Sequence, residues 1–232
     1  GYETERLLNT YAVYHNEDFD VLMDVSDGTE VRFLHENQVI LSDKENTLPS
    51  FLTFNGSLMG LFILASYIFL DKKEGVIKAY AVTPSPVWHY LLSKVGIVTV
   101  TSLITSLIIT IPIMGAQPNY LAMLVFLLAS GFAASAVGLL LTSFYDDIMQ
   151  AFGTLYVLLI ALMLPNIAYF IPTWSPAWMQ AIPTYSMLES FKEALLPNGD
   201  INYILFTSLA YFAAGLALFL LANVRFKKTL SI

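Results

Sequence analysis

Side chains able to act as acids, bases, nucleophiles or metal ligands are scarce in this sequence and do not gather. Cysteine is absent, which excludes disulfides, thiolate zinc sites and a cysteine nucleophile. The three histidines, His15, His35 and His89, have none of the spacings that metal ligands require. Serine and aspartate are present, but nothing in the sequence places them beside a histidine. We therefore predict no catalytic, cofactor or metal site in this chain.

A pair of adjacent carboxylates, Asp146-Asp147, stands in a short turn between two apolar runs. Paired carboxylates can bind a cation or perform acid–base chemistry. The favoured alternative is that they end one helix and stabilise the N-terminus of the next, where the helix dipole attracts negative charge.

The segment 71–94, DKKEGVIKAYAVTPSPVWHYLLSK, is the other candidate, because it holds four lysines between two apolar runs. Residues 73–82 are able to form a short helix with Val76, Ile77 and Tyr80 along one side. Prolines at positions 84 and 86 would then end it, since a residue before proline is driven out of the α region. This pattern is typical of a docking element, and a loop that only fixes topology is the alternative.

The elements that must position these residues are set by composition. The chain has 232 residues, of which 56% are hydrophobic and 12% are charged, against about 25% charged in soluble domains. Five runs are apolar enough, and close to the ~20 residues needed, to cross a bilayer as helices. We predict an all-α integral membrane protein with a transmembrane domain over 49–228 and spans at about 49–70, 95–114, 120–143, 149–172 and 201–223.

Lysine and arginine in the short loops predict the orientation, because they are retained on the cytoplasmic side. The loop 71–94 and the segment after residue 223 carry seven of them, whereas the loops 115–119 and 173–200 carry one, Lys192. The loop 71–94, the C-terminus and a tail at 229–232 are therefore predicted to be cytoplasmic.

Residues 1–48 are then extracytoplasmic, and Asp27-Gly28 between two β-leaning runs predicts a small β-containing segment there. An upstream helix would carry this segment across, which gives six spans in the full protein. Residues 184–196 predict an amphipathic helix on the outer surface, because apolar and charged residues occupy different faces. Small residues at 56, 60, 131, 135 and 138 predict close helix packing within the bundle.

Two stretches resemble type-two ABC transporter permeases, over about residues 50–228. In the first, Glu74-Gly75 precedes a short apolar helix, Thr83-Pro84 and a re-entry that ends at Lys94. In the second, IPTWSPAWMQAIPTYSMLESFKEALLPNG is similar to the family's proline-rich external stretch before its last helix. The family's first helix has no counterpart in this chain.

The resemblance implies the permease subunit of an ATP-driven exporter in a prokaryotic cytoplasmic membrane. The chain has no G-x-x-x-x-G-K-[ST] sequence, so ATP and magnesium are expected in a separate ABC ATPase and no cofactor in this chain. A second permease copy or a homologous permease, lipid, and a small amphipathic or lipid-like substrate are the other expected partners. Nucleic acid is not expected, because no basic face is evident. The residues implied in ATPase coupling are Glu74, Gly75, Val76, Ile77, Tyr80, Thr83 and Pro84.

The substrate path is expected at the permease dimer interface, lined by the first and fourth spans of this chain. The residues implied there are Phe51, Phe54, Asn55, Tyr156 and Asn166. The alternatives are a secondary transporter, which commonly needs ionisable residues inside its spans, and a non-transporting membrane assembly protein. The five runs have no ionisable residue in their interiors, and co-purification with an ATPase would separate the alternatives.

Overall fold

The computed structural model describes residue 41 and residues 44–171 and 176–230. All its elements are helical, and no β-strand occurs within that part of the chain, which confirms the predicted all-α class. The β-containing segment predicted in residues 1–48 falls almost entirely outside the described residues. In chain order the elements are η1 (Glu45–Thr47), α3 (Leu48–Phe51), η2 (Leu52–Leu58), α4 (Met59–Lys73), α5 (Val76–Ala81), α6 (Val87–Met114), α7 (Tyr120–Thr142), α8 (Ile148–Tyr169), η3 (Ala177–Ala181), α9 (Pro183–Leu195) and α10 (Ile201–Leu230).

Five described helices are long and apolar enough to cross a membrane, as predicted. They cover Glu45–Lys73, Val87–Met114, Tyr120–Thr142, Ile148–Tyr169 and Ile201–Lys228. The second begins eight residues before the predicted position 95, directly after Pro86, whose extended backbone (φ −69°, ψ 142°) precedes the first helical residue. The helix thus begins about two turns earlier, with a segment that contains His89 and Lys94 and that an apolar-run criterion leaves out.

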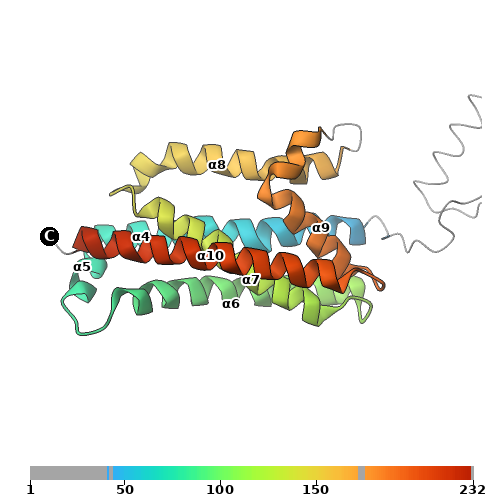
Figure 1. Cartoon of the computed structure of the whole chain (residues 1–232), viewed down its shortest axis with the longest axis horizontal. Helices are drawn as coiled ribbons and strands as arrows, with labels where there is room; N and C mark the ends of the chain where they lie inside the picture. Colours follow the sequence, from blue (N-terminus) through green and yellow to red (C-terminus); the bar gives the residue numbers. More distant parts are fainter. Residues whose placement is uncertain (1–40, 42–43, 172–175, 231–232) are drawn as a thin grey trace, which may run out of the picture. The chain divides into compact units, whose positions relative to one another are not determined.

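The helix α7 is the most buried of the five: 61% of its most apolar 18 residues are buried, against 17% for α8. It packs against α4, α6 and α10 (Figure 1). Its glycines allow this approach, since a Cβ at Gly138 would lie 2.9 Å from the carbonyl oxygen of Leu61 and one at Gly131 would lie 3.3 Å from that of Gly56. The predicted close packing of small residues within the bundle is confirmed.

The first span is not a uniform α-helix, because η2 is a seven-residue π-helix between α3 and α4. Hydroxyl groups of neighbouring helices bond to this segment. Ser102 Oγ donates to the Gly56 carbonyl oxygen at 2.7 Å, and Ser57 Oγ donates to Ser130 Oγ at 2.9 Å. Polar side chains thus join η2 to α6 and to α7 in an otherwise apolar bundle.

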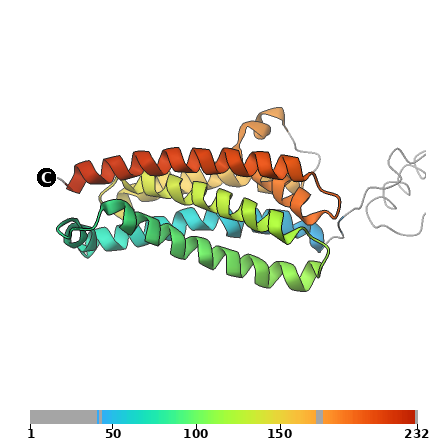
Figure 2. The same cartoon turned by 60° about the horizontal axis from the view of Figure 1, so that its bottom comes forward.

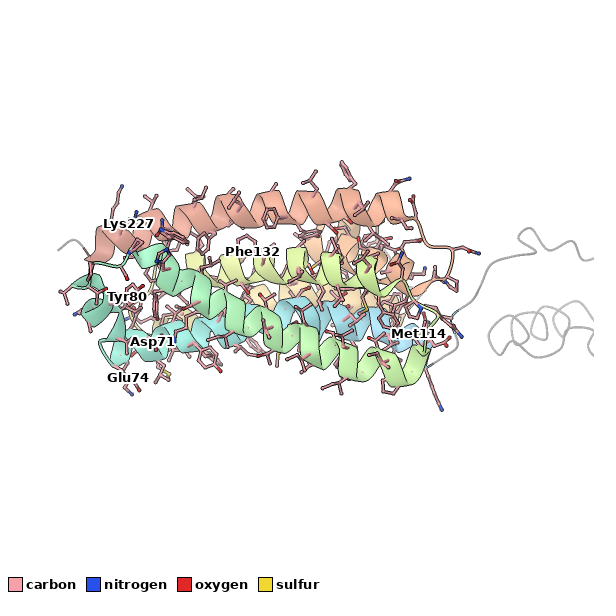
Figure 3. The ribbon with its side chains drawn as sticks, turned by 90° about the horizontal axis from the view of Figure 1, so that it is seen from below. Asp71, Glu74, Tyr80, Met114, Phe132 and Lys227 are labelled. Carbon is pink, nitrogen blue, oxygen red and sulfur yellow. The ribbon has the colours of Figure 1, made fainter. Side chains whose placement is uncertain are left out.

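The two basic segments lie at the same end of the helices, as the predicted topology requires. The helix α5 and the end of α10 are together in both views, with the turn after α6 at the opposite end (Figures 1 and 2). Figure 3 shows Asp71, Glu74, Tyr80 and Lys227 at one end and Met114 at the other. We refer to the first as the α5 end.

The predicted amphipathic helix is α9, which has 13 residues and is not among the candidate spans. Its apolar face packs into the bundle: Leu188, Phe191 and Leu195 are at most 2% exposed. The ring of Phe191 lies 4.8 Å from that of Phe126 in α7, in edge-to-face geometry.

Candidate functional site

The loop between the first two spans contains the short helix α5, as the sequence predicts. A left-handed backbone at Gly75 (φ 75°) turns the chain out of α4 and into α5. Glycine adopts this conformation without the steric cost that a Cβ brings. The Ala79 amide then donates to the Gly75 carbonyl oxygen at 3.0 Å, which begins the new helix.

Threonine and proline end α5. The hydroxyl and the amide of Thr83 both donate to the Tyr80 carbonyl oxygen, at 2.7 and 3.0 Å. Pro84 follows, and no helix resumes until Val87. Glu74, Thr83 and Pro84 are exposed to solvent. Because hydrogen bonds define both ends of α5, the loop presents an ordered helical turn at the surface.

The apolar side of α5 does not all face outward, and this corrects the expected placement of Ile77 and Tyr80. Ile77 is only 4% exposed and belongs to an apolar cluster with residues of α4, α6 and α10. Tyr80 packs against the same cluster, with its ring 5.4 Å from that of Tyr90. Burial of these side chains removes apolar area from water, and it holds α5 against its own bundle.

The outward side of α5 retains apolar groups. Val76 is 38% exposed and Val82 is 87% exposed, and Ala79 between them is also exposed. These three residues follow one another at three-residue steps, which places them on one helical face. We call Val76, Ala79 and Val82 the outer face of α5.

The structure contains an ion pair at the base of this loop, which the residues predicted for the site did not include. Asp71, in the last turn of α4, lies with Oδ2 2.6 Å from Lys94 Nζ in α6. The same oxygen accepts a hydrogen bond from the Tyr90 hydroxyl. The sequence does contain a hint of this pair. Asp71 follows the first apolar run and Lys94 precedes the second, so two consecutive antiparallel helices bring opposite charges to the same end.

Lys72 makes a second link from α4. Its Nζ donates to the carbonyl oxygens of Thr142 and Tyr145, at 2.6 and 2.5 Å. It also lies 5.6 Å from the ring centre of Phe226 in α10. Thr142 is the last residue of α7 and Tyr145 lies in the turn after it, where carbonyl groups lack helical partners. Lys72 therefore joins α4 to the turn between α7 and α8.

One carboxylate of that turn, that of Asp147, has a structural role, which supports the favoured interpretation of Asp146-Asp147 for this residue. Asp147 is the N-cap residue of α8, and its Oδ1 accepts a hydrogen bond from the Met149 amide at 2.7 Å. Such a cap satisfies an amide at the start of the helix that has no helical partner.

The five residues predicted for a substrate path lie on α3, η2 and α8 and differ in their contacts. Asn55 donates to Thr105 Oγ1 in α6 at 3.0 Å, and Phe51 packs against the apolar cluster around Phe191. Phe54 is half-buried.

The two path residues on α8 differ in environment. Tyr156 is 54% exposed and stacks on Phe152, with ring centres 6.3 Å apart. Asn166 is 3% exposed, and neither atom of its amide group has a hydrogen-bond partner within the described part of the chain. A buried amide without a partner is unfavourable.

Comparison with known proteins places these features in a family. Residues 27–225 match the family described as ABC-2 family transporter protein. The fluoroquinolones export permease proteins of two Mycobacterium tuberculosis strains are each 24% identical to this chain over 164 residues, which cover 67% of this chain and 67% of the relative. No solved structure matches.

Proposed function

The chain belongs to the ABC-2 family of transporter proteins, and from this premise we propose that it couples transport to a separate ATP-binding subunit through α5. It is a multi-pass membrane protein and a permease of an ABC transporter. Membership implies, in general, an ABC ATPase partner and a dimeric assembly. ATP and magnesium would bind in the ATPase, and the permease would supply no catalytic group.

The observation that carries the coupling role is the outer face of α5. Val76, Ala79 and Val82 are apolar and exposed, yet α5 lies between the candidate spans rather than within one. Apolar groups that are exposed at the α5 end, outside the candidate spans, favour contact with another protein. Ile77 and Tyr80 then anchor α5 to the bundle, while Glu74, Gly75, Thr83 and Pro84 shape its two ends.

The side of the membrane follows from charge. The α5 end holds the lysines of the loop 71–94 and the basic C-terminal residues, so we assign it to the cytoplasm by the positive-inside rule. The ATPase would then meet α5 in the cytoplasm of a prokaryotic cell, and α9 would lie at the outer surface.

A second permease would cover α8. This helix exposes Phe152, Tyr156 and Ile160, and it has few buried residues of its own. We assign the substrate path to the interface between the two permeases, where Tyr156 would meet substrate. Phe54, half-buried on η2, would adjoin this path, whereas Phe51 and Asn55 would support it through their packing and hydrogen bond.

The transported compound would be an amphipathic or lipid-like molecule moved out of the cell. The mycobacterial relatives are named for fluoroquinolone export, so a fluoroquinolone such as norfloxacin is a suitable first probe. Aromatic side chains with a few polar groups suit a compound of this kind, and Tyr156 is the exposed aromatic residue assigned to the path.

Co-expression of the permease with an ABC ATPase from the same genome tests the proposal. The ATPase should co-purify with the unmodified permease, and Val82→Asp should abolish co-purification because it places a charge on the outer face. Gln117→Asp, which places the same charge at an exposed position at the opposite end, is the control. An ATPase that binds Val82→Asp as well as the unmodified protein would reject α5 as the docking element.

A further inference from the structure

Three side chains at the α5 end, Asp71, Tyr90 and Lys94, form a cluster that we call the charged clamp. The Asp71 carboxylate accepts a hydrogen bond from the Tyr90 hydroxyl and lies 2.6 Å from the Lys94 ammonium group. The side chains of Asp71 and Lys94 are 11% and 24% exposed, so both charges are largely removed from water. The net stability that such a pair contributes is small, because desolvation opposes the attraction.

The clamp is not needed to bring α4 and α6 together. The two helices already share an apolar cluster that contains Ile68 of α4 and Leu91 of α6, both fully buried. Apolar contacts are non-directional, whereas an ion pair with a hydrogen bond holds a defined geometry. The clamp therefore fixes the rotation of the last turn of α4 relative to the first turns of α6.

A continuous set of contacts joins α5 to the clamp. The ring of Tyr80 lies 5.4 Å from the ring of Tyr90, whose hydroxyl is bonded to Asp71. The ammonium group of Lys94 lies 5.6 Å from the same Tyr90 ring. Any displacement of α5 thus acts on the ring that holds the carboxylate of α4.

Lys72, the residue after Asp71, links α4 to a second segment, the turn between α7 and α8. Consecutive residues of a helix point about 100° apart, and Lys72 bonds the carbonyl oxygens of Thr142 and Tyr145 while Asp71 bonds α6. The last turn of α4 is therefore tied to α6 on one side and to the turn before α8 on the other.

We propose that the charged clamp transmits movement of α5 into α4 and, through Lys72, to α8. Asp71, Tyr90 and Lys94 are positioning residues in this scheme, since they touch neither substrate nor ATP. The inference rests on the proposed function, because only a bound ATPase would move α5. A clamp that merely stabilises the helix ends would leave the response to ATP intact.

The experiment uses the permease in complex with its ATPase in lipid nanodiscs. Because the chain has no cysteine, Met149→Cys supplies a single thiol on the permease, at the exposed start of α8 and outside the residues assigned to the substrate path. The rate of its reaction with a membrane-permeant maleimide is measured with and without a non-hydrolysable ATP analogue. Lys94→Met and Asp71→Asn remove the ion pair, Lys94→Arg preserves it, and Lys227→Met is the control for loss of a positive charge at the same end.

The ATP analogue should change the labelling rate in the Met149→Cys background. We expect this change to fall at least about fivefold in Lys94→Met and Asp71→Asn, the lower end of typical coupling between sites. It should persist in Lys94→Arg and Lys227→Met, with the ATPase bound in every variant. A full response in Lys94→Met or Asp71→Asn, or an equal loss in Lys94→Arg, would overturn the proposal.

Two further outcomes are informative. A background whose labelling ignores ATP also overturns the proposal, because movement then does not reach α8. If the charge variants fail to fold, Tyr90→Phe decides, since it removes one oxygen and keeps the ring: an unchanged response contradicts the clamp, and a reduced one supports it. Failure of any ATPase to bind the unmodified permease would instead refute the proposed function.

Discussion

The ring of Tyr80 in α5 lies 5.4 Å from the ring of Tyr90 in α6, and the two planes are tilted by 43°. Together with Ile77, which is 4% exposed, this contact makes α5 part of the bundle on one side. The outer face remains for a partner. Substitutions on the two sides of this six-residue helix should therefore have separable effects, one on stability and the other on assembly.

Replacement of Tyr80 by leucine tests the inner side. Loss of the aromatic pair should lower the free energy of unfolding by about 0.5–1.5 kcal/mol, which thermal unfolding of the purified permease would register as a lower midpoint. Val82→Ser is the matched control, because Val82 is 87% exposed and contributes little to packing. Equal midpoints for both variants would contradict the inward placement of Tyr80.

Gly138→Ala tests the close approach of α7 and α4. The added Cβ would lie 2.9 Å from the backbone oxygen of Leu61, so the helices must separate, at a cost of about 1–3 kcal/mol in stability. Gly96→Ala in α6 meets nothing within 4 Å and should be neutral or slightly stabilising, because alanine is the better helix former. Thermal unfolding of the two variants would rank them, and a Gly138→Ala protein as stable as Gly96→Ala would show that the contact is slack.

The orientation can be tested with single thiols in this cysteine-free chain. Lys78 and Gln117 are exposed in the loops at opposite ends. In intact cells an impermeant maleimide should label Gln117→Cys from outside and leave Lys78→Cys unlabelled until the membrane is opened. Labelling of Lys78→Cys in intact cells would reverse the assigned topology.

The proposed permease dimer predicts a cross-link on α8. Tyr156→Cys should form a disulfide-linked dimer on mild oxidation, because two copies would bring this face together. Val100→Cys in α6 is the control, since both positions are 54% exposed but only Tyr156 is assigned to the interface. Equal yields of dimer at the two positions would remove the basis for this assignment.

The spans were predictable from sequence because length and apolarity are what a bilayer requires of a helix. The existence of α5 was also predictable, since Gly75 and the prolines after Thr83 define its ends. Which side of α5 faces the bundle was not predictable. Apolar residues occur on several sides of this short helix, at positions 76, 77, 79, 80 and 82, and only the surface supplied by Tyr90 and its neighbours selects among them.

The contacts of individual polar residues could not be predicted from the sequence, for a related reason. Asp71 and Lys94 are 23 positions apart, and their pairing depends on the register of two antiparallel helices, which hydrophobicity does not determine. The same holds for the hydrogen bond that Asn55 donates to Thr105 in α6. Positions on a helix can be assigned from spacing, whereas partners require the neighbouring helix to be placed.

The π-helix η2 gives the first span a tolerance to changes in chain length that its neighbours lack. Its bonds run from residue i to i+5 and enclose one residue more than those of an α-helix. Deletion of one residue between Leu52 and Leu58 can therefore be absorbed by conversion to an α-helix, with α3 and α4 still facing their present neighbours. The same deletion in the middle of α7 would turn half of that helix by about 100° and separate Gly131 from Gly138 on the packed face. Single-residue deletions that survive selection in this bundle should accordingly gather at η2.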